Sequence, residues 1–191
     1  MLNPDFARGL FDAIVEEVLV PWILYQKKNF PNTTNIGGSD AVASLPILNL
    51  GILEEWVLPY ILRLREICGP EVYVPNWVGE KYLKNPEELL ALKLKVSPGF
   101  LEGQDPDVEA LGPTLYKEYA KKHNVPLVLG VGASFLAQAT PDEVGQRVKD
   151  YVEVGGRKGR FALYLCNLGA TTPAENVKAA IEAIHAYGQY N

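Results

Sequence analysis

Residues 126–131, with the sequence Pro-Leu-Val-Leu-Gly-Val, form a continuous apolar run. A strand that is apolar on both faces is typical of a parallel sheet covered on both sides. The run lies between a predicted helix at residues 113–123 and another that begins near Thr140. A strand between two helices predicts a strand-helix-strand unit, in which right-handed crossovers join parallel strands.

The same alternation extends along the chain. Apolar spacing and Gly or Pro punctuation predict about five strands, at residues 33–36, 71–74, 94–96, 126–131 and 161–166. About six helices are predicted: from Asn3 to a break at 29–31, at 50–68, 86–93 and 113–123, and from Thr140 and Thr172 onward. Residues 97–106, rich in Gly and Pro, are expected to form a connector. The predicted class is α/β with a parallel sheet.

Several helix boundaries carry local signals. Asn3 followed by Pro4 predicts an N-cap with proline in the first turn. Thr140-Pro141-Asp142-Glu143 and Thr172-Pro173-Ala174-Glu175 both predict a capping box, with Thr at the N-cap and Glu three residues later. Pro59 predicts a kink or boundary inside the second helix.

Composition limits the class of protein. A chain of 191 residues, 48% apolar and 21% charged, is expected to form one globular domain, residues 1–191. A net charge of -5 without a basic run makes nucleic acid an unlikely partner. Two cysteines and an N-terminus without signal-peptide features predict a cytoplasmic protein with no disulfide and no membrane span. Met1 before a well-formed helix favours a natural start, although a truncated piece of a longer enzyme stays an alternative.

The number of strands leaves two architectures open. A closed (β/α)8 barrel needs eight strands and typically about 250 residues. Five strands therefore predict either an open sheet or part of a barrel that is completed elsewhere.

Four segments, in order, resemble the C-terminal half of the uroporphyrinogen decarboxylase superfamily, which includes the cobalamin-dependent methyltransferases. They are Gly38-Ser39-Asp40-Ala41 leading to Trp56-Val57-Leu58-Pro59-Tyr60; residues 72–79; Leu129-Gly130 with residues 139–144; and Cys166-Asn167-Leu168-Gly169 with residues 172–177. Together they span nearly the whole chain. The ending Asn-Leu-Gly with Thr-Pro-x-Glu-Asn-Val is the most specific of them.

The resemblance implies the second half of a (β/α)8 barrel, beginning before its fourth strand. It implies action on or around a tetrapyrrole or methyl-corrinoid, as a decarboxylase (a lyase of porphyrin metabolism) or a cobalamin-dependent methyltransferase. A corrinoid would be a substrate or be held by a partner. The expected partner is an N-terminal-half chain or a second copy that completes the barrel, since exposed strand edges need cover. The rival hypothesis is a non-catalytic binding or structural subunit.

Sites in this superfamily lie at the C-terminal ends of the strands, here the loops 37–44, 75–80, 130–135 and 166–172. Ser39 matches a substrate-contacting Ser of the decarboxylases, and Ser39 and Asp40 are the candidate catalytic residues. The candidate substrate-binding residues are Gly38, Asn76, Trp77, Gly130 and Asn167. The alternatives are that Asp40 only caps a turn and that Trp77 is part of the core.

The sequence also departs from the family pattern. Ala170 stands where the decarboxylases have a functional His, and Asn76-Trp77-Val78-Gly79 stands where the methyltransferases have a His-x-Cys-Gly zinc motif. No metal site is therefore expected, and Cys166 is interpreted as a small buried hydrophobe. The basic loop at Arg157, Lys158 and Arg160 could meet acidic substrates, but the favoured interpretation is a solvated turn.

Overall fold

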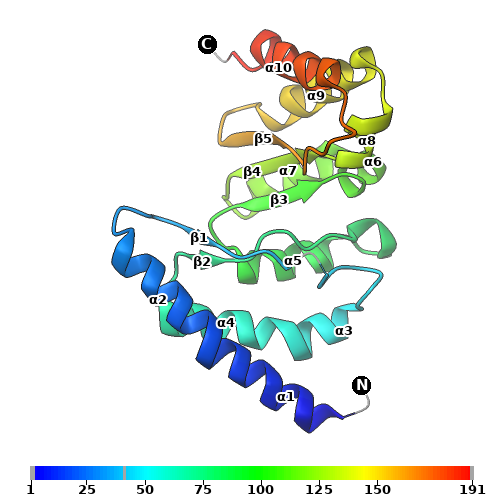
Figure 1. The fold of residues 1–191 in the computed structure, drawn as a ribbon. Coiled ribbons are helices and arrows are strands. Elements are labelled where there is room, and N and C mark those ends of the chain that lie inside the picture. The colour runs from blue at the N-terminus through cyan, green and yellow to red at the C-terminus, as the bar shows by residue number, and fades with distance from the viewer. Residues whose placement is uncertain (1–2, 41, 190–191) are drawn as a thin grey trace. The chain divides into compact units, whose positions relative to one another are not determined.

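A computed structural model describes residues 3–40 and 42–189, so Ala41 of the Gly38-Ser39-Asp40-Ala41 segment lies outside the described residues. The chain divides into two compact units (Figure 1). Unit 1 comprises Met1–Trp77 and Glu88–Pro98, and unit 2 comprises Val78–Glu87 and Gly99–Asn191. The expectation of a single domain over residues 1–191 stays a prediction.

Unit 1 begins with a long helix in three parts: α1 (Pro4–Ala13), the π-helical segment η1 (Ile14–Leu19) and α2 (Val20–Asn29). The predicted N-cap is confirmed, because Asn3 Oδ1 accepts a hydrogen bond from the Phe6 N–H at 3.1 Å. The helix ends before Phe30, at the predicted break. The π-helical segment was not predicted from the sequence.

The second helix of unit 1 is also in three parts: α3 (Leu50–Ile52), the π-helical segment η2 (Leu53–Val57) and α4 (Leu58–Cys68). Pro59 lies in the first turn of α4, so the predicted boundary is confirmed. The two long helices pack through a buried cluster of Val15, Ile23, Leu64, Cys68 and Val72.

The sheet of unit 1 has two short parallel strands, β1 (Ile36–Gly37) and β2 (Val72–Tyr73). Of the strand predicted at 33–36, only Ile36 pairs. The strand predicted at 94–96 is wrong, because α5 (Glu87–Val96) continues through it. Leu89, Leu92, Lys93 and Val96 are buried at helical spacing, and Pro98 follows the end of the helix.

Unit 2 contains a parallel three-stranded sheet in the order β3 (Leu101–Gln104), β4 (Leu127–Val131) and β5 (Phe161–Leu165). The strands predicted at 126–131 and 161–166 are confirmed. The prediction of a connector at 97–106 is wrong for residues 101–104, which form β3. This strand pairs with β4 from Leu101, opposite Leu127, to Gln104, opposite Gly130. Two parallel sheets are thus present where one was expected.

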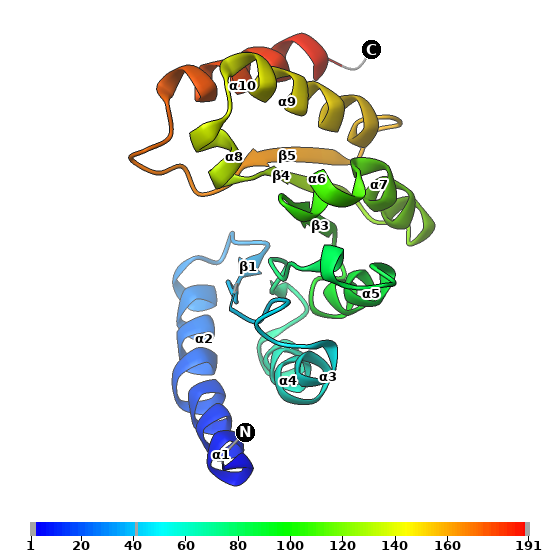
Figure 2. The ribbon, with the colours of Figure 1, turned by 90° about the vertical axis from the view of Figure 1, so that its right-hand side faces the viewer.

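The sheet of unit 2 is covered by helices on one face (Figure 2). These are α6 (Asp107–Leu111), α7 (Pro113–Lys122) and α9 (Pro141–Gly155), while α10 (Ala174–Tyr187) packs on α9 and α8 (Ala133–Gln138). A Cβ at Gly103 would lie 2.6 Å from the Tyr116 ring of α7, so Leu101 and Gly103 face the helices. Three elements were not among the six predicted helices: α6, α8 and the 3-10 turn η3 (Glu80–Tyr82).

One of the two predicted capping boxes forms. Thr140 Oγ1 accepts from the Glu143 N–H at 3.4 Å, and Glu143 Oε2 accepts from the Thr140 N–H at 2.7 Å. The box at Thr172 is wrong, because α10 begins at Ala174 with Pro173 at its N-cap. The Thr172 hydroxyl instead accepts from the Gly169 N–H at 3.1 Å, within the preceding loop.

The α/β class with parallel strands is confirmed, and each sheet keeps the strands in sequence order. This order is the one found in (β/α) barrels. Of the helices in the described part of the chain, none is both long and apolar enough to span a bilayer.

Candidate functional site

In unit 1 the predicted loops after β1 and β2 meet through the side chain of Asn76. Its Oδ1 accepts a hydrogen bond from the Asp40 backbone N–H at 3.0 Å, and its Nδ2 donates to Ser39 Oγ at 2.9 Å. Gly38 donates its N–H to the Tyr73 carbonyl at 2.8 Å, which extends the strand pairing to the start of the loop. Ser39, Asp40 and Asn76, predicted separately, are thus brought together at the carboxyl ends of two parallel strands.

The Asp40 carboxyl is half-buried beside Trp77. Burial raises its pKa above the ordinary value, while the Trp77 side chain and the Ala43 backbone N–H offset part of the effect. The indole Nε1 of Trp77 forms no hydrogen bond of standard geometry. Burial is therefore the main cause of the raised Asp40 pKa. A carboxyl with a raised pKa is suited to holding or passing a proton.

Trp77 itself is fully buried, with 0% of its surface exposed. This burial agrees with the alternative in which the ring is part of the core. Direct contact with a substrate stays a prediction.

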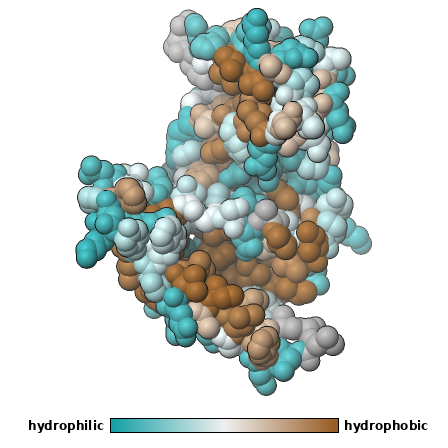
Figure 3. Space-filling model, viewed as in Figure 1, coloured by the Kyte–Doolittle hydropathy of each residue, from teal (hydrophilic) through white to brown (hydrophobic). Residues whose placement is uncertain are grey.

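Asp40 also borders an apolar groove of about 370 Å³ in unit 1. One wall comes from α1 and η1, and the other from η2 and α4. Its lining includes Phe11, Ile14, Leu19, Val42, Trp56 and Tyr60. Figure 3 shows hydrophobic side chains gathered along the helices of unit 1. Both walls include π-helical segments, which are frequent at functional sites. Among the described residues of the lining, Asp40 is the only carboxyl. The groove therefore suits a largely apolar ligand with one polar group.

Asp40→Asn should remove a loss of stability that grows with pH. The folded pKa of Asp40 lies above the unfolded value, so between the two values the folded state binds more protons than the unfolded state. The free energy of unfolding contributed by Asp40 therefore falls as pH rises through that window. Urea unfolding of both proteins between about pH 3 and 7 should show the variant gaining stability relative to wild type as pH rises. Parallel curves would show that the Asp40 pKa is not raised.

In unit 2 the predicted residues Gly130 and Asn167 lie at the carboxyl ends of β4 and β5. Asn167 lines a pocket of about 310 Å³, together with Gln104, Asp105, Ser134 and Cys166 among others, and Gly130 is not part of this lining. Gly130 is required by close packing, because a Cβ there would lie 2.6 Å from Tyr164 Cζ and 2.7 Å from Cys166 Sγ. Asn167 is exposed, with a positive φ of 40°.

Asp105, which sequence analysis missed, is the most connected carboxylate at this end of the sheet. Its side chain is only 3% exposed. Its Oδ2 accepts from the Gly132 N–H at 3.0 Å and from Arg147 Nη1 at 3.1 Å, and its Oδ1 accepts from the Tyr151 hydroxyl. Arg147 also binds Glu109 at 2.7 Å. Asp105 thus ties the ends of β3 and β4 to α9.

The face of this sheet opposite the helices carries a chain of polar groups. The Tyr164 hydroxyl lies 2.6 Å from Glu102 Oε1 and 3.1 Å from Gln104 Oε1, and Cys166 Sγ lies 3.4 Å from the same Gln104 oxygen. Burial raises the pKa of Cys166 to about 11, and it also raises that of Tyr164. Both groups are therefore protonated near neutral pH, which agrees with Cys166 as a small buried side chain.

Glu102, Gln104 and Asp105 are not among the predicted site residues, because the sequence predicts a connector at residues 97–106 where β3 forms. The available signal was the alternation of Leu101 and Gly103 with two polar residues, which is the period of a strand. Within the described residues, no group of three or more His, Cys, Asp or Glu side chains is placed to hold a metal ion.

Comparison with known proteins finds solved structures whose fold is similar to that of this chain. No protein-family model matches the chain, and no curated protein matches it. Among solved structures 12 chains match. One is a methyltransferase from Methanosarcina mazei, with a TM-score of 0.62 and 18% sequence identity over 87% of this chain and 46% of that chain.

At this identity the likeness establishes the fold alone. The chain spans less than half of the length of that methyltransferase. The neighbour supports the expected relation to a methyltransferase fold, and it does not single out the decarboxylases.

Proposed function

We propose that the chain is the second half of a methyltransferase-type (β/α)8 barrel of the uroporphyrinogen decarboxylase superfamily. In this proposal it acts in the cytoplasm on or around a methyl-corrinoid or related tetrapyrrole. One observation carries the proposal: the fold match covers 87% of this chain but only 46% of a methyltransferase. A half-length match with strands in sequence order is what one half of a barrel would give.

The polar face of the sheet in unit 2 supports the proposal. In a closed barrel the helices cover the outer face of the strands, and the opposite face lines the interior. Glu102, Gln104, Tyr164 and Cys166 share that opposite face, and Gln104, Tyr164 and Cys166 lie at or near the carboxyl ends of their strands. These are the ends where barrel enzymes carry their sites.

In this proposal the residues have distinct roles. Asp40 orients or protonates the ligand, with Ser39 and Asn76 as polar contacts from the same loops. The apolar groove beside Asp40 receives part of the macrocycle. In unit 1, Gly38 allows close approach of the backbone and Trp77 is a candidate substrate contact. In unit 2, Gly130 and Asn167 have the corresponding candidate roles. A corrinoid would be the substrate or be held by a partner. The identity of the ligand would decide whether the reaction is methyl transfer or decarboxylation.

The remaining strands would come from a second chain, a second copy or further residues of a longer protein. Support comes from an apolar stripe along α1, η1 and α2. Its members recur every three or four residues and are exposed: Phe6, Leu10, Ile14, Val18, Trp22 and Tyr25. A stripe of this kind marks a surface that another protein segment covers.

A non-catalytic binding or structural subunit is the second candidate. The protonated Cys166 thiol favours it, because a thiol with a pKa of about 11 is a poor nucleophile and a poor metal ligand. In that case the strand-end loops would hold a ligand without reacting with it.

Light scattering followed by titration with methylcobalamin on the same sample tests the proposal. We expect an assembly larger than a monomer that binds methylcobalamin. Asp40→Asn should weaken the binding by about ten-fold or more, since a hydrogen bond to a charged or polar group is lost. Asp150→Asn, on the exposed surface of α9, is the matched control and should bind as wild type. A monomer that binds no corrinoid would overturn the proposal, and unchanged affinity of Asp40→Asn would remove this loop from the site.

A further inference from the structure

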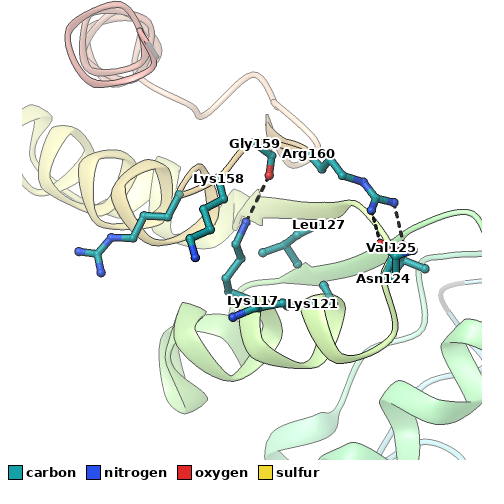
Figure 4. Close-up of a pocket in the computed structure, with 10 residues that line it drawn as sticks. Lys117, Lys121, Asn124, Val125, Leu127, Lys158, Gly159 and Arg160 are labelled. Atoms are coloured by element: carbon teal, nitrogen blue, oxygen red, sulfur yellow. Dashed lines mark hydrogen bonds between the residues drawn. The ribbon is translucent and has the colours of Figure 1, made fainter. Parts of the chain in front are cut away.

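The amino-terminal end of the sheet in unit 2 carries a basic pocket of about 190 Å³ (Figure 4). It is lined by Lys117, Lys121, Asn124, Arg157, Lys158 and Arg160, among others. The two lysines at 117 and 121 come from α7, and the other three cations come from the turn between α9 and β5. This end is opposite to the one that holds Asp105 and Asn167.

Two of the five cations are held in place by neutral groups. Lys117 Nζ donates to the Gly155 carbonyl at 2.5 Å and to the Gly159 carbonyl at 3.4 Å. The Arg160 guanidinium donates to Asn124 Oδ1 at 2.6 Å and to the Asn124 carbonyl at 2.8 Å. Burial lowers the pKa of Lys117. These contacts fix the positions of the charges without neutralising them.

The other three cations, Lys121, Arg157 and Lys158, have no side-chain hydrogen bond or salt bridge to any residue that the structure describes. Among the residues that the structure describes, no Asp or Glu belongs to the pocket lining. By contrast, the neighbouring Lys122 points elsewhere and pairs with Glu87 at 3.1 Å. Five cations therefore share one pocket without a carboxylate to balance them.

The backbone around the pocket is unusual at the same residues. Asn124, Lys158 and Arg160 have positive φ angles of 55°, 67° and 57°. Residues other than glycine rarely adopt this backbone conformation, and those that do are concentrated at functional sites. At Lys158 and Arg160 the chain keeps a cationic side chain where glycine would be less strained.

We propose that this pocket binds a small phosphate-bearing anion, at a site separate from the strand-end loops. Lysine and arginine together suit phosphate, which offers several acceptor oxygens and up to two negative charges. The pocket volume of about 190 Å³ suits a small anion. Figure 4 shows Lys117 reaching up from α7 and Lys158 extending down from the turn, so both border the same space.

Thermal unfolding of the whole chain tests the site with inorganic phosphate and pyrophosphate as probes. A ligand that binds only the folded state raises the melting temperature. We expect both phosphate species to raise it, with saturation, above the value in sodium chloride of equal ionic strength. Citrate separates phosphate from carboxylate chemistry, and an equal rise with citrate would overturn the choice of phosphate. An equal rise with chloride would mean salt screening alone and would overturn the site.

Two variants locate the site. Lys121→Gln removes one unpartnered cation, and Lys158→Gly removes another at a position where glycine fits the backbone and should not unfold the chain. The double variant should bind pyrophosphate at least about ten-fold more weakly than wild type, as expected when charge-assisted contacts are lost. Lys122→Gln, one residue away on α7 and outside the pocket, is the matched control and should bind as wild type. Unchanged affinity in the double variant would place the anion elsewhere and overturn the proposal.

Discussion

Replacing Asp105 with alanine should lower the free energy of unfolding by about 3–5 kcal/mol, the cost of breaking a buried ion pair by removing one partner. The Asp105 side chain is 3% exposed and that of Arg147 is 16% exposed, so water cannot fully replace the lost carboxylate. The change would also leave the Gly132 N–H and the Tyr151 hydroxyl without their acceptor. Buried donors without partners add to the loss.

Glu109→Ala is the matched control for Asp105. Glu109 binds the same Arg147 guanidinium at 2.7 Å, but its side chain is 49% exposed, so we expect a loss of about 1 kcal/mol or less. Urea unfolding followed by circular dichroism compares the two variants. If both lose the same small amount, the Asp105 cluster does not hold β3 and β4 to α9.

The elements that could be predicted are those whose signals are local. The apolar run at 126–131 and the helix cap at Asn3 depend on neighbouring residues, and both are found. The box at Thr140 forms for the same reason. Thr172 has an equivalent sequence, but its hydroxyl accepts from the Gly169 N–H three residues earlier, so a competing local turn takes the place of the cap.

The elements that could not be predicted depend on distant contacts. The strand β3 contains Glu, Gly and Gln, which are poor strand formers. It forms because Gly103 lets Tyr116 pack against the strand and because β4 pairs along its length. The missed Asp105 follows from that error, since its partners come from residues 132, 147 and 151 and share no sequence spacing.

The candidate site was partly predictable. Ser39 and Asn76 were predicted separately, as residues of two strand-end loops, and the structure joins them by a hydrogen bond. The groove beside Asp40 was not expected, because its walls come from helices that are about 40 residues apart in the chain. Periodicity shows which face of a helix is apolar, and it does not show whether two such faces leave space between them.

The role of Trp77 can be decided by two substitutions. Trp77→Ala should lower the free energy of unfolding by about 3–5 kcal/mol, because the ring is fully buried and its removal leaves a cavity. Trp77→Phe should cost less than Trp77→Ala, since a smaller apolar ring is kept, leaves a smaller cavity, and the indole Nε1 has no hydrogen bond to lose.

Urea unfolding followed by circular dichroism, together with methylcobalamin titration, separates the two roles of this residue. A core residue gives a large stability loss for Trp77→Ala and a smaller loss for Trp77→Phe, with the affinity of Trp77→Phe equal to that of wild type. A ligand-binding residue gives the opposite pattern, in which Trp77→Phe folds normally but binds more weakly. Equal stability of the alanine variant and wild type would show that the ring does not support the fold.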